Sequence, residues 1–99
     1  QQNESSPYKF SLADNYPNPF NPVTVIRYSL SANSNVTLKV YDVLGKEVAT
    51  LLNNDLMGEG NHEVQFDASK LSSGIYFYRL TSSHKSSSYT SVKKMVLMK

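Results

Sequence analysis

The chain lacks cysteine altogether, and its four glycines, at positions 45, 58, 60 and 74, lie in three separate segments. Without cysteine, neither disulfides nor thiolate metal sites are available. This absence is compatible with export but does not identify a compartment, because nothing here requires a controlled redox environment. No apolar run approaches the roughly 20 residues that a membrane-spanning helix needs. We therefore expect the 99 residues to form one domain without a transmembrane segment.

A signal peptide is also missing from the first residues. We therefore expect residue 1 to lie inside a larger precursor. Residues 1–6 read Gln-Gln-Asn-Glu-Ser-Ser, a polar stretch that is typical of a flexible linker. The expected organisation is a linker over residues 1–7, which follows a cargo domain, and a folded domain over residues 8–99.

Acidic residues are absent from the last third of the chain. Residues 68–99 contain six Lys and Arg residues and no Asp or Glu, whereas residues 1–67 contain four basic and eight acidic residues. Such an asymmetry of sign indicates an interaction surface at one end of the chain. The alternative is a solvated strand face that keeps the protein soluble and its sheet edge unpaired.

A proline-rich run stands before the first long strand candidate. Proline fixes φ and donates no main-chain hydrogen bond, so this run forms neither a helix nor a central strand. Residues before proline also favour extended geometry. We expect a stiff, extended crossing in which Tyr16 and Phe20 pack on the edge of the core. The run consists of Asn15, Tyr16, Pro17, Asn18, Pro19, Phe20, Asn21 and Pro22.

Alternation of apolar and polar residues predicts an all-β chain. The expected strands are residues 8–12, 23–30, 36–42, 46–52, 62–67, 74–81 and 92–98. The expected turns and loops, rich in Ser, Asn, Asp and Gly, are residues 31–35, 53–61 and 82–88. The segment after Gly45 also fits a short helix. Its place after a tight turn favours a hairpin, because glycine readily adopts positive φ.

Seven or eight short strands with turns every 8–12 residues are typical of an immunoglobulin-like antiparallel β-sandwich. The spacing Leu71-x-x-Gly74-x-Tyr76 matches a tyrosine corner, in which the hydroxyl bonds to main chain a few residues upstream. Tyr78 occupies the position where antibody domains place their second cysteine. We therefore expect packing to hold the core where those domains add a disulfide. The side chains expected to face the core are Ile26, Tyr28, Leu30, Val36, Leu38, Val40, Val64, Phe66, Tyr76, Tyr78 and Leu80.

No constellation of residues supports catalysis. His62 and His84 are isolated from each other, and only Glu59 and Glu63 stand close to either of them in the sequence. The segment 72–74 reads Ser-Ser-Gly and lacks the leading glycine of a nucleophile elbow. We predict a protein that is not an enzyme and that holds no metal or other cofactor.

Aromatic residues leave one alternative function open. Exposed aromatics on a β-sandwich stack on sugar rings, and Tyr41, Phe77 and Tyr89 are the candidates for exposed positions. Residues 75–79 interleave aromatics with a basic residue but lack the Lys/Gly-rich opening of the RNA-binding signature, so we expect no nucleic-acid partner. The alternative function is therefore a carbohydrate-binding or structural accessory module of a secreted hydrolase.

Three blocks of sequence occur together in this chain. The first is the proline-rich run followed by Thr24-Val25-Ile26-Arg27-Tyr28-Ser29-Leu30. The second is Val36-Thr37-Leu38-Lys39-Val40-Tyr41-Asp42-Val43-Leu44-Gly45-Lys46-Glu47-Val48. The third is Leu71-Ser72-Ser73-Gly74-Ile75-Tyr76-Phe77-Tyr78-Arg79-Leu80, closed by residues 93–99. In this combination the chain resembles the type-A C-terminal sorting domains of the bacterial type IX secretion system, and also the related immunoglobulin-like domain of flagellar hook-capping proteins.

The resemblance implies a place at the C-terminus of a larger exported cargo, often a hydrolase or adhesin. The domain would fold in the periplasm and be recognised by the outer-membrane translocon. A surface cysteine peptidase acting as a sortase would then remove it, so that the cargo ends at the cell surface or outside the cell. On this sequence the cut falls in the linker before Tyr8. The recognition signal falls on the last strand, at Lys93, Lys94, Met95, Val96, Leu97, Met98 and Lys99.

A C-terminal strand at a sheet edge offers a physical mode for this recognition. Its unpaired N–H and C=O groups accept a strand from another protein, and side chains supply the specificity. Lys93, Lys94 and Lys99 would steer this edge to an acidic receptor groove. Two alternatives remain: the lysines only protect the edge, or the domain is a structural spacer for which no receptor exists.

Overall fold

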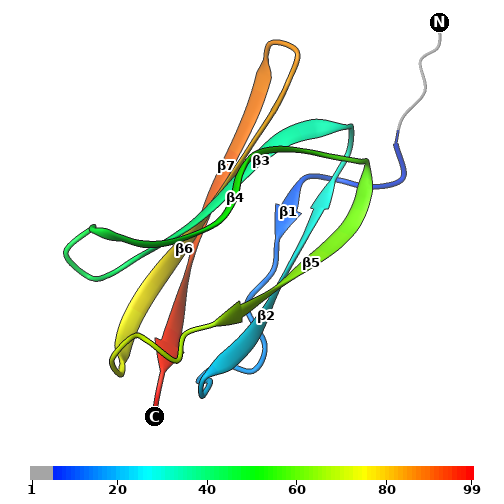
Figure 1. The fold of residues 1–99 in the computed structure, drawn as a ribbon. Helices are drawn as coiled ribbons and strands as arrows, with labels where there is room; N and C mark the ends of the chain where they lie inside the picture. The colour runs from blue at the N-terminus through cyan, green and yellow to red at the C-terminus, as the bar shows by residue number, and fades with distance from the viewer. Residues whose placement is uncertain (1–5) are drawn as a thin grey trace, which may run out of the picture.

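The computed structural model describes residues 6–99, which form seven strands in two packed sheets (Figure 1). The strands are β1 (Ser11–Leu12), β2 (Val23–Leu30), β3 (Ser34–Tyr41), β4 (Glu47–Met57), β5 (Gly60–Asp67), β6 (Gly74–His84) and β7 (Ser87–Leu97). One sheet has the order β1-β2-β5 and the other β4-β3-β6-β7, with every neighbouring pair antiparallel. The predicted all-β sandwich is confirmed, and the described part of the chain contains no helix.

The fourth strand gives the sandwich its division into three and four strands. In constant-type immunoglobulin domains the fourth strand belongs to the first sheet, beside the fifth. Here β4 pairs with β3 instead, in a ladder that begins at Ser34↔Met57 and ends at Tyr41↔Glu47. The second sheet is therefore the larger one, and β7 forms one of its two edges.

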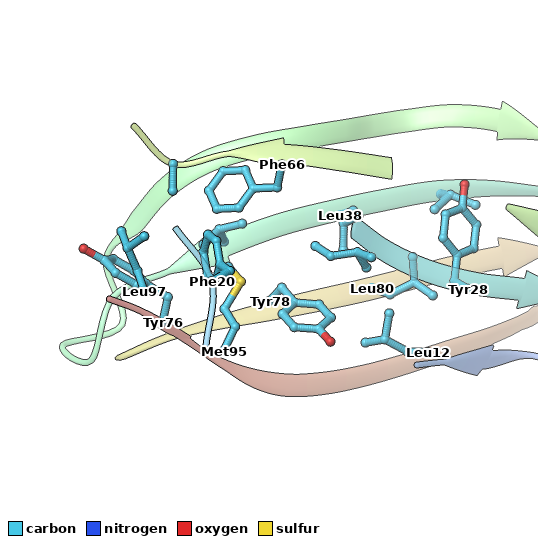
Figure 2. Packing of buried hydrophobic residues seen from close by; sticks show 14 of the residues in the cluster. Leu12, Phe20, Tyr28, Leu38, Phe66, Tyr76, Tyr78, Leu80, Met95 and Leu97 are labelled. Atoms are coloured by element: carbon cyan, nitrogen blue, oxygen red, sulfur yellow. The ribbon is translucent and has the colours of Figure 1, made fainter. Parts of the chain in front are cut away.

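Alternation along the strands places one face of each sheet in a common core (Figure 2). Arg27 is exposed between the buried residues Ile26 and Tyr28 of β2, and Arg79 is exposed between Tyr78 and Leu80 of β6. The predicted inward faces are confirmed, although Val64 is only half-buried. Each fully buried apolar side chain contributes about 1.5–3 kcal/mol. The core consists of Leu12, Phe20, Ile26, Tyr28, Leu30, Val36, Leu38, Val40, Phe66, Ala68, Tyr76, Tyr78, Leu80, Met95 and Leu97.

Two tyrosines of β6 tie the core to the loops around it. The Tyr76 hydroxyl donates to the Ser72 carbonyl oxygen at 2.6 Å, so the predicted tyrosine corner is present. The Tyr78 hydroxyl donates to the Ala13 carbonyl oxygen at 2.7 Å. Burial raises the pKa of Tyr78 to about 12, because the charged phenolate would lose its hydration. Tyr78 thus joins β6 to the segment that enters the proline-rich run.

A buried amide fixes the proline-rich run against β2. The Asn15 side chain is buried and its Nδ2 donates to the Pro17 carbonyl oxygen at 3.1 Å and to Thr24 Oγ1 at 3.0 Å. Thr24 Oγ1 in turn donates to the same Pro17 carbonyl oxygen at 2.8 Å. Phe20 is 2% exposed, and its ring centroid lies 6.3 Å from that of Phe66. The expected packing of Phe20 on the core is therefore confirmed.

The expected packing of Tyr16 is wrong, because its side chain is 73% exposed. The main chain of Tyr16 exchanges two hydrogen bonds of 3.0 Å with Val25. Residues that are paired in this way carry their side chains on the same side of the ladder. Val25 belongs to the outward face of β2, between the buried residues Thr24 and Ile26, so Tyr16 also points away from the core.

Two of the predicted loops are wrong, since both are largely strand. Residues 53–61 continue β4 as far as Met57, and β5 begins at Gly60. A left-handed Asn54, with φ of 56°, allows this polar stretch to bend without leaving the sheet. Residues 82–88 likewise extend the β6–β7 hairpin, in which His84 pairs with Ser87. Lys85 adopts positive φ at the tip of this hairpin, a conformation that in hairpin turns is usually adopted by glycine or asparagine.

The remaining boundaries differ less. The expected strand over residues 8–12 is shorter, because only β1 pairs with β2. The expected turn over residues 31–35 is also shorter, because β3 already begins at Ser34. Gly45 has φ of 85°, as expected for the β3–β4 turn. The linker predicted for residues 1–7 lies mostly outside the described residues.

Candidate recognition surface

The inner side of β7 belongs to the core. Met95 and Leu97 are fully buried, and Figure 2 shows their side chains among those of the hydrophobic cluster. Both were predicted as part of a recognition signal. While the domain is folded, neither side chain is accessible from outside the sandwich.

The edge of β7 is closed near its C-terminal end. The Phe20 N–H donates to the Val96 carbonyl oxygen at 2.9 Å, and the Met98 N–H donates to the Phe20 carbonyl oxygen at 3.0 Å. The Val96 N–H donates to Asn18 Oδ1 at 3.0 Å. The expectation of an unpaired edge is therefore wrong at Val96 and Met98, because the proline-rich run occupies it there.

The same edge is open farther toward the N-terminal end of β7. In an antiparallel ladder, alternate residues direct their N–H and C=O groups away from the paired strand. The main-chain groups of Val96 bond on the side of β7 that faces away from β6, and the register with β6 is unbroken. The N–H and C=O groups of Lys94, Val92 and Thr90 therefore also point away from β6, in the plane of the sheet. Among residues 6–99, no sheet ladder covers this side of β7. A foreign strand therefore has a short free edge here, not the whole terminal segment.

The three C-terminal lysines lie in three different environments. Lys93 Nζ is 3.5 Å from Asp14 Oδ1, on the side of the strand that carries the core residues. Lys99 Nζ donates to the Ser69 carbonyl oxygen at 2.7 Å, and its N–H donates to Ser73 Oγ at 3.0 Å. Lys94 is exposed on the outer face of the sheet. The three lysines therefore do not form one basic row.

The outer face of the four-stranded sheet combines aromatic, aliphatic and basic side chains. The register places Tyr41 opposite Phe77 and Phe77 opposite Lys94, across β3, β6 and β7. Arg79 lies opposite Val92 in the neighbouring row. Its guanidinium carbon stands 4.8 Å from the centroid of the Tyr41 ring, within the range of a cation–π contact. Apolar surface and positive charge therefore meet on one face.

A shallow hollow of about 300 Å³ lies on this face, next to the β3–β4 turn. Asp42 Oδ1 holds the turn in shape by accepting the N–H groups of Leu44 at 3.0 Å and of Lys46 at 2.9 Å. The turn presents Val43 and Leu44 to solvent, with Leu44 89% exposed. The residues that line the hollow are Tyr41, Asp42, Val43, Gly45, Phe77, Arg79 and Val92.

An ion pair beside this face holds the carboxylate of Glu47. Lys39 Nζ is 3.2 Å from Glu47 Oε1, and the Thr50 hydroxyl donates to the same carboxylate. The hydrogen bond from Thr50, together with Lys39, lowers the pKa of Glu47. Glu47 is therefore held in its charged form by groups of this domain.

The aromatic row expected for sugar stacking is incomplete. Tyr41 and Phe77 are register neighbours on the outer face, and both are half-buried. Tyr89 instead belongs to the opposite face of β7, where its ring stacks on Phe10 with centroids 5.6 Å apart. The three aromatics therefore do not form one flat platform.

The two histidines are bound to main chain. His62 Nε2 is 2.6 Å from the Gly58 carbonyl oxygen, and His84 Nδ1 is 2.7 Å from the Asn33 carbonyl oxygen. Within residues 6–99, no three His, Cys, Asp or Glu side chains come together in a way that would hold a metal ion. The same part of the chain contains no helix that is long and apolar enough to span a membrane.

Sequence reasoning missed the residues that close the edge and the residues that join the outer face. Asn18 and Val96 are 78 positions apart, and no local pattern links them. The contact between Arg79 and Tyr41 depends on the register between β3 and β6, which alternation alone does not specify. The sequence offered two signals for this face: the excess of basic residues after residue 67, and the alternation that places Arg79 and Lys94 away from the core.

The chain matches the family described as "Secretion system C-terminal sorting domain" over residues 14–98. No curated protein matches it. Among solved structures, it is similar to the crystal structure of CopC from Methylosinus trichosporium OB3b. That likeness has a TM-score of 0.57 at 16% identity and covers 90% of this chain and 93% of the other. At this identity it shows a shared fold alone.

Proposed function

Because the chain belongs to the family of secretion system C-terminal sorting domains, we propose that it is the sorting signal of an exported bacterial protein and that the type IX machinery of the outer membrane recognises it. The match over residues 14–98 is the observation that carries the proposal, since it spans six of the seven strands, from the proline-rich run to the end of β7. In this account the domain is a recognition module and performs no catalysis.

The signal is read in the folded state. The last seven residues include Met95 and Leu97, which are fully buried. A receptor that bound this segment as an extended peptide would expose both side chains, at a cost of about 1.5–3 kcal/mol each. The partner therefore binds a folded surface to which residues 93–99 contribute their outward side chains.

Removal of the domain follows export. A sortase-like cysteine peptidase at the cell surface cuts the linker before Tyr8 and frees the preceding cargo. The observation that favours this position is the exposure of Pro7 and Tyr8, because proteases require accessible main chain. Residues 1–5 of the proposed linker lie outside the described part of the chain.

A reporter fusion tests the proposal. A periplasm-directed reporter carries residues 1–99 at its C-terminus, in a host with the type IX machinery and in the same host without the translocon. We expect reporter at the surface or in the medium only when tail and translocon are both present. Reporter that stays in the periplasm of the competent host, or that leaves equally well without the translocon, would contradict the proposal.

A further inference from the structure

The outer face of β6 and β7 exposes apolar side chains next to two cations that pair with no acidic residue among residues 6–99. We propose, on the basis of the proposed function, that the export machinery reads this face through its side chains and does not add a strand to the edge of β7. The partner is a protein surface that combines apolar side chains with Asp or Glu carboxylates. We define the outer patch as Tyr41, Ile75, Phe77, Arg79, Val92 and Lys94.

The other surfaces of β7 are buried or partly occupied. The inner side of β7 is buried at Met95 and Leu97. The edge is occupied at Val96 and Met98 by the proline-rich run and is free only at Thr90, Val92 and Lys94. The outer face of β6 and β7, by contrast, exposes the side chains of Ile75, Arg79, Val92 and Lys94.

The register makes the outer patch continuous. Ile75 is opposite Val96, Phe77 is opposite Lys94, and Arg79 is opposite Val92. Directly opposed side chains in an antiparallel pair lie within contact distance of one another. Ile75 is 43% and Val92 55% exposed, so the apolar part of the patch is accessible to a partner.

Charge identifies the chemistry of the partner. The outer patch contains two cations, Arg79 and Lys94, and no acidic residue. The ion pairs of residues 6–99 are Arg27–Glu63, Lys39–Glu47 and Lys93–Asp14, none of which includes a cation of the patch. The carboxylates beside the patch, Asp42 and Glu47, bind other groups of this domain, and Arg79 acts on Glu47 only as a weaker, additional positive charge. Because neither cation of the patch has an ion-pair partner among residues 6–99, both can pair with carboxylates of a partner.

The hollow supplies an anchor point. It lies between the β3–β4 turn and the patch, and Tyr41, Phe77 and Val92 form part of its wall. Buried aromatic and aliphatic anchors in small pockets contribute much of the binding free energy at protein interfaces. An apolar side chain of the partner in this hollow would place its acidic neighbours beside Arg79.

Charge reversal tests the inference in the reporter fusion described above. The double variant Arg79→Glu/Lys94→Glu reverses the patch, and the double variant Lys70→Glu/Lys85→Glu makes the same change of net charge at two other exposed positions. We expect the patch variant to lose about tenfold or more of the exported reporter, because two attractive contacts become repulsive. The control stays within about twofold of wild type.

A proline variant separates side-chain recognition from strand addition. The Thr90 N–H points away from β6, toward the free edge of the sheet. Thr90→Pro therefore removes a hydrogen-bond donor from that edge without removing a bond to β6. Recognition through the outer patch predicts export within about twofold of wild type. Strand addition at the free edge predicts loss of export.

The outcomes distinguish the two proposals. Failure of the unchanged tail to export the reporter refutes the proposed function itself. With the unchanged tail active, the inference is overturned if the patch variant exports normally, if the control loses as much as the patch variant, or if Thr90→Pro alone abolishes export. Circular dichroism melts of the purified 99-residue variants check folding. Should the charge reversal unfold the domain, the neutral pair Arg79→Gln/Lys94→Gln replaces it, with the same expected direction.

Discussion

The two faces of the four-stranded sheet differ in almost every respect. The inner face is built mainly of buried apolar side chains and of Tyr76 and Tyr78, whose hydroxyls bond to the loops, although Lys93 and Tyr89 also lie on this side of β7. The outer face displays the outer patch, with cations set among half-exposed aromatic and aliphatic side chains. Both faces are formed by the same strands, and successive side chains along a strand point to opposite faces. Neighbouring residues of β6 or β7 therefore have different roles: one packs in the core, and the next is available to a partner.

This contrast explains how a short terminal segment can serve two purposes. Residues 93–99 hold the end of the sandwich through Met95 and Leu97, and they present Lys94 outward. A change on the inner side should therefore lower stability, and lower export only as a consequence. A change on the outer side should lower export and leave stability intact.

The largest effect is expected from Leu97→Ala on the inner face. Truncation of a fully buried leucine removes apolar contacts and leaves a cavity, at a cost of about 2–5 kcal/mol. Urea unfolding of the purified domain measures this loss. The matched control is Met98→Ala, whose side chain is 59% exposed and should cost less than about 0.5 kcal/mol. Equal losses in the two variants would contradict the assignment of the faces.

The next largest effect is a dependence of stability on pH that comes from the buried phenol of Tyr78 in β6. Tyr78 has a folded-state pKa of about 12, above the ordinary value of 10.0 that we expect in the unfolded chain. The folded state then binds the phenol proton more tightly than the unfolded chain does. The contribution of Tyr78 to the unfolding free energy is therefore complete below pH 10 and is lost as the pH rises through about 12. We expect the unfolding free energy to fall by about 2 kcal/mol more in wild type than in Tyr78→Phe across this range. Parallel pH profiles for the two proteins would show that Tyr78 is not the titrating group.

A smaller effect is expected where the proline-rich run closes the edge of β7. Asn18→Ala removes the acceptor of the Val96 N–H and should cost about 1 kcal/mol. Hydrogen exchange at the Val96 amide should accelerate, while the exchange of amides in the middle of β6 stays unchanged. Asn21→Ala, at an exposed position of the same run, serves as control. Slow exchange at Val96 in the Asn18 variant would indicate that another group closes the edge.

The smallest effect is expected on the outer face. Val92→Thr keeps the branched shape of a 55% exposed side chain and replaces one methyl group by a hydroxyl. The unfolding free energy should change by less than about 0.5 kcal/mol. Reporter export should nevertheless fall measurably, because the change introduces a polar group into the proposed contact. A stability loss comparable to that of Leu97→Ala would remove the distinction between the faces.

The sequence was sufficient for the fold class, the tyrosine corner and the inward faces, because these depend on local alternation and on short spacings such as that between Leu71 and Tyr76. It was insufficient for the hairpin ends, where polar residues such as Asn54 and Lys85 continue the strands through left-handed conformations. Tyr16 was misplaced because its orientation follows from pairing with Val25, a contact that composition does not encode.

The candidate surface was predictable only in part. The excess of basic residues after residue 67 indicated an interaction surface, and outward parity was readable for Lys94. The separation of the three lysines was not readable, because it depends on long-range partners such as Asp14 and Ser69. The closure of the strand edge by Asn18 and Phe20 joins opposite ends of the chain and is visible only in the folded protein.

Photo-crosslinking in cells that carry the type IX machinery shows whether the outer patch contacts that machinery. A photoreactive amino acid replaces Lys94 on the outer face of β7 or, in a second fusion, Glu63 at an exposed position of β5 in the other sheet. We expect position 94 to crosslink to an outer-membrane component of the machinery, and we expect no crosslink from position 63. Crosslinks from position 63 with none from position 94 would contradict recognition through the outer patch.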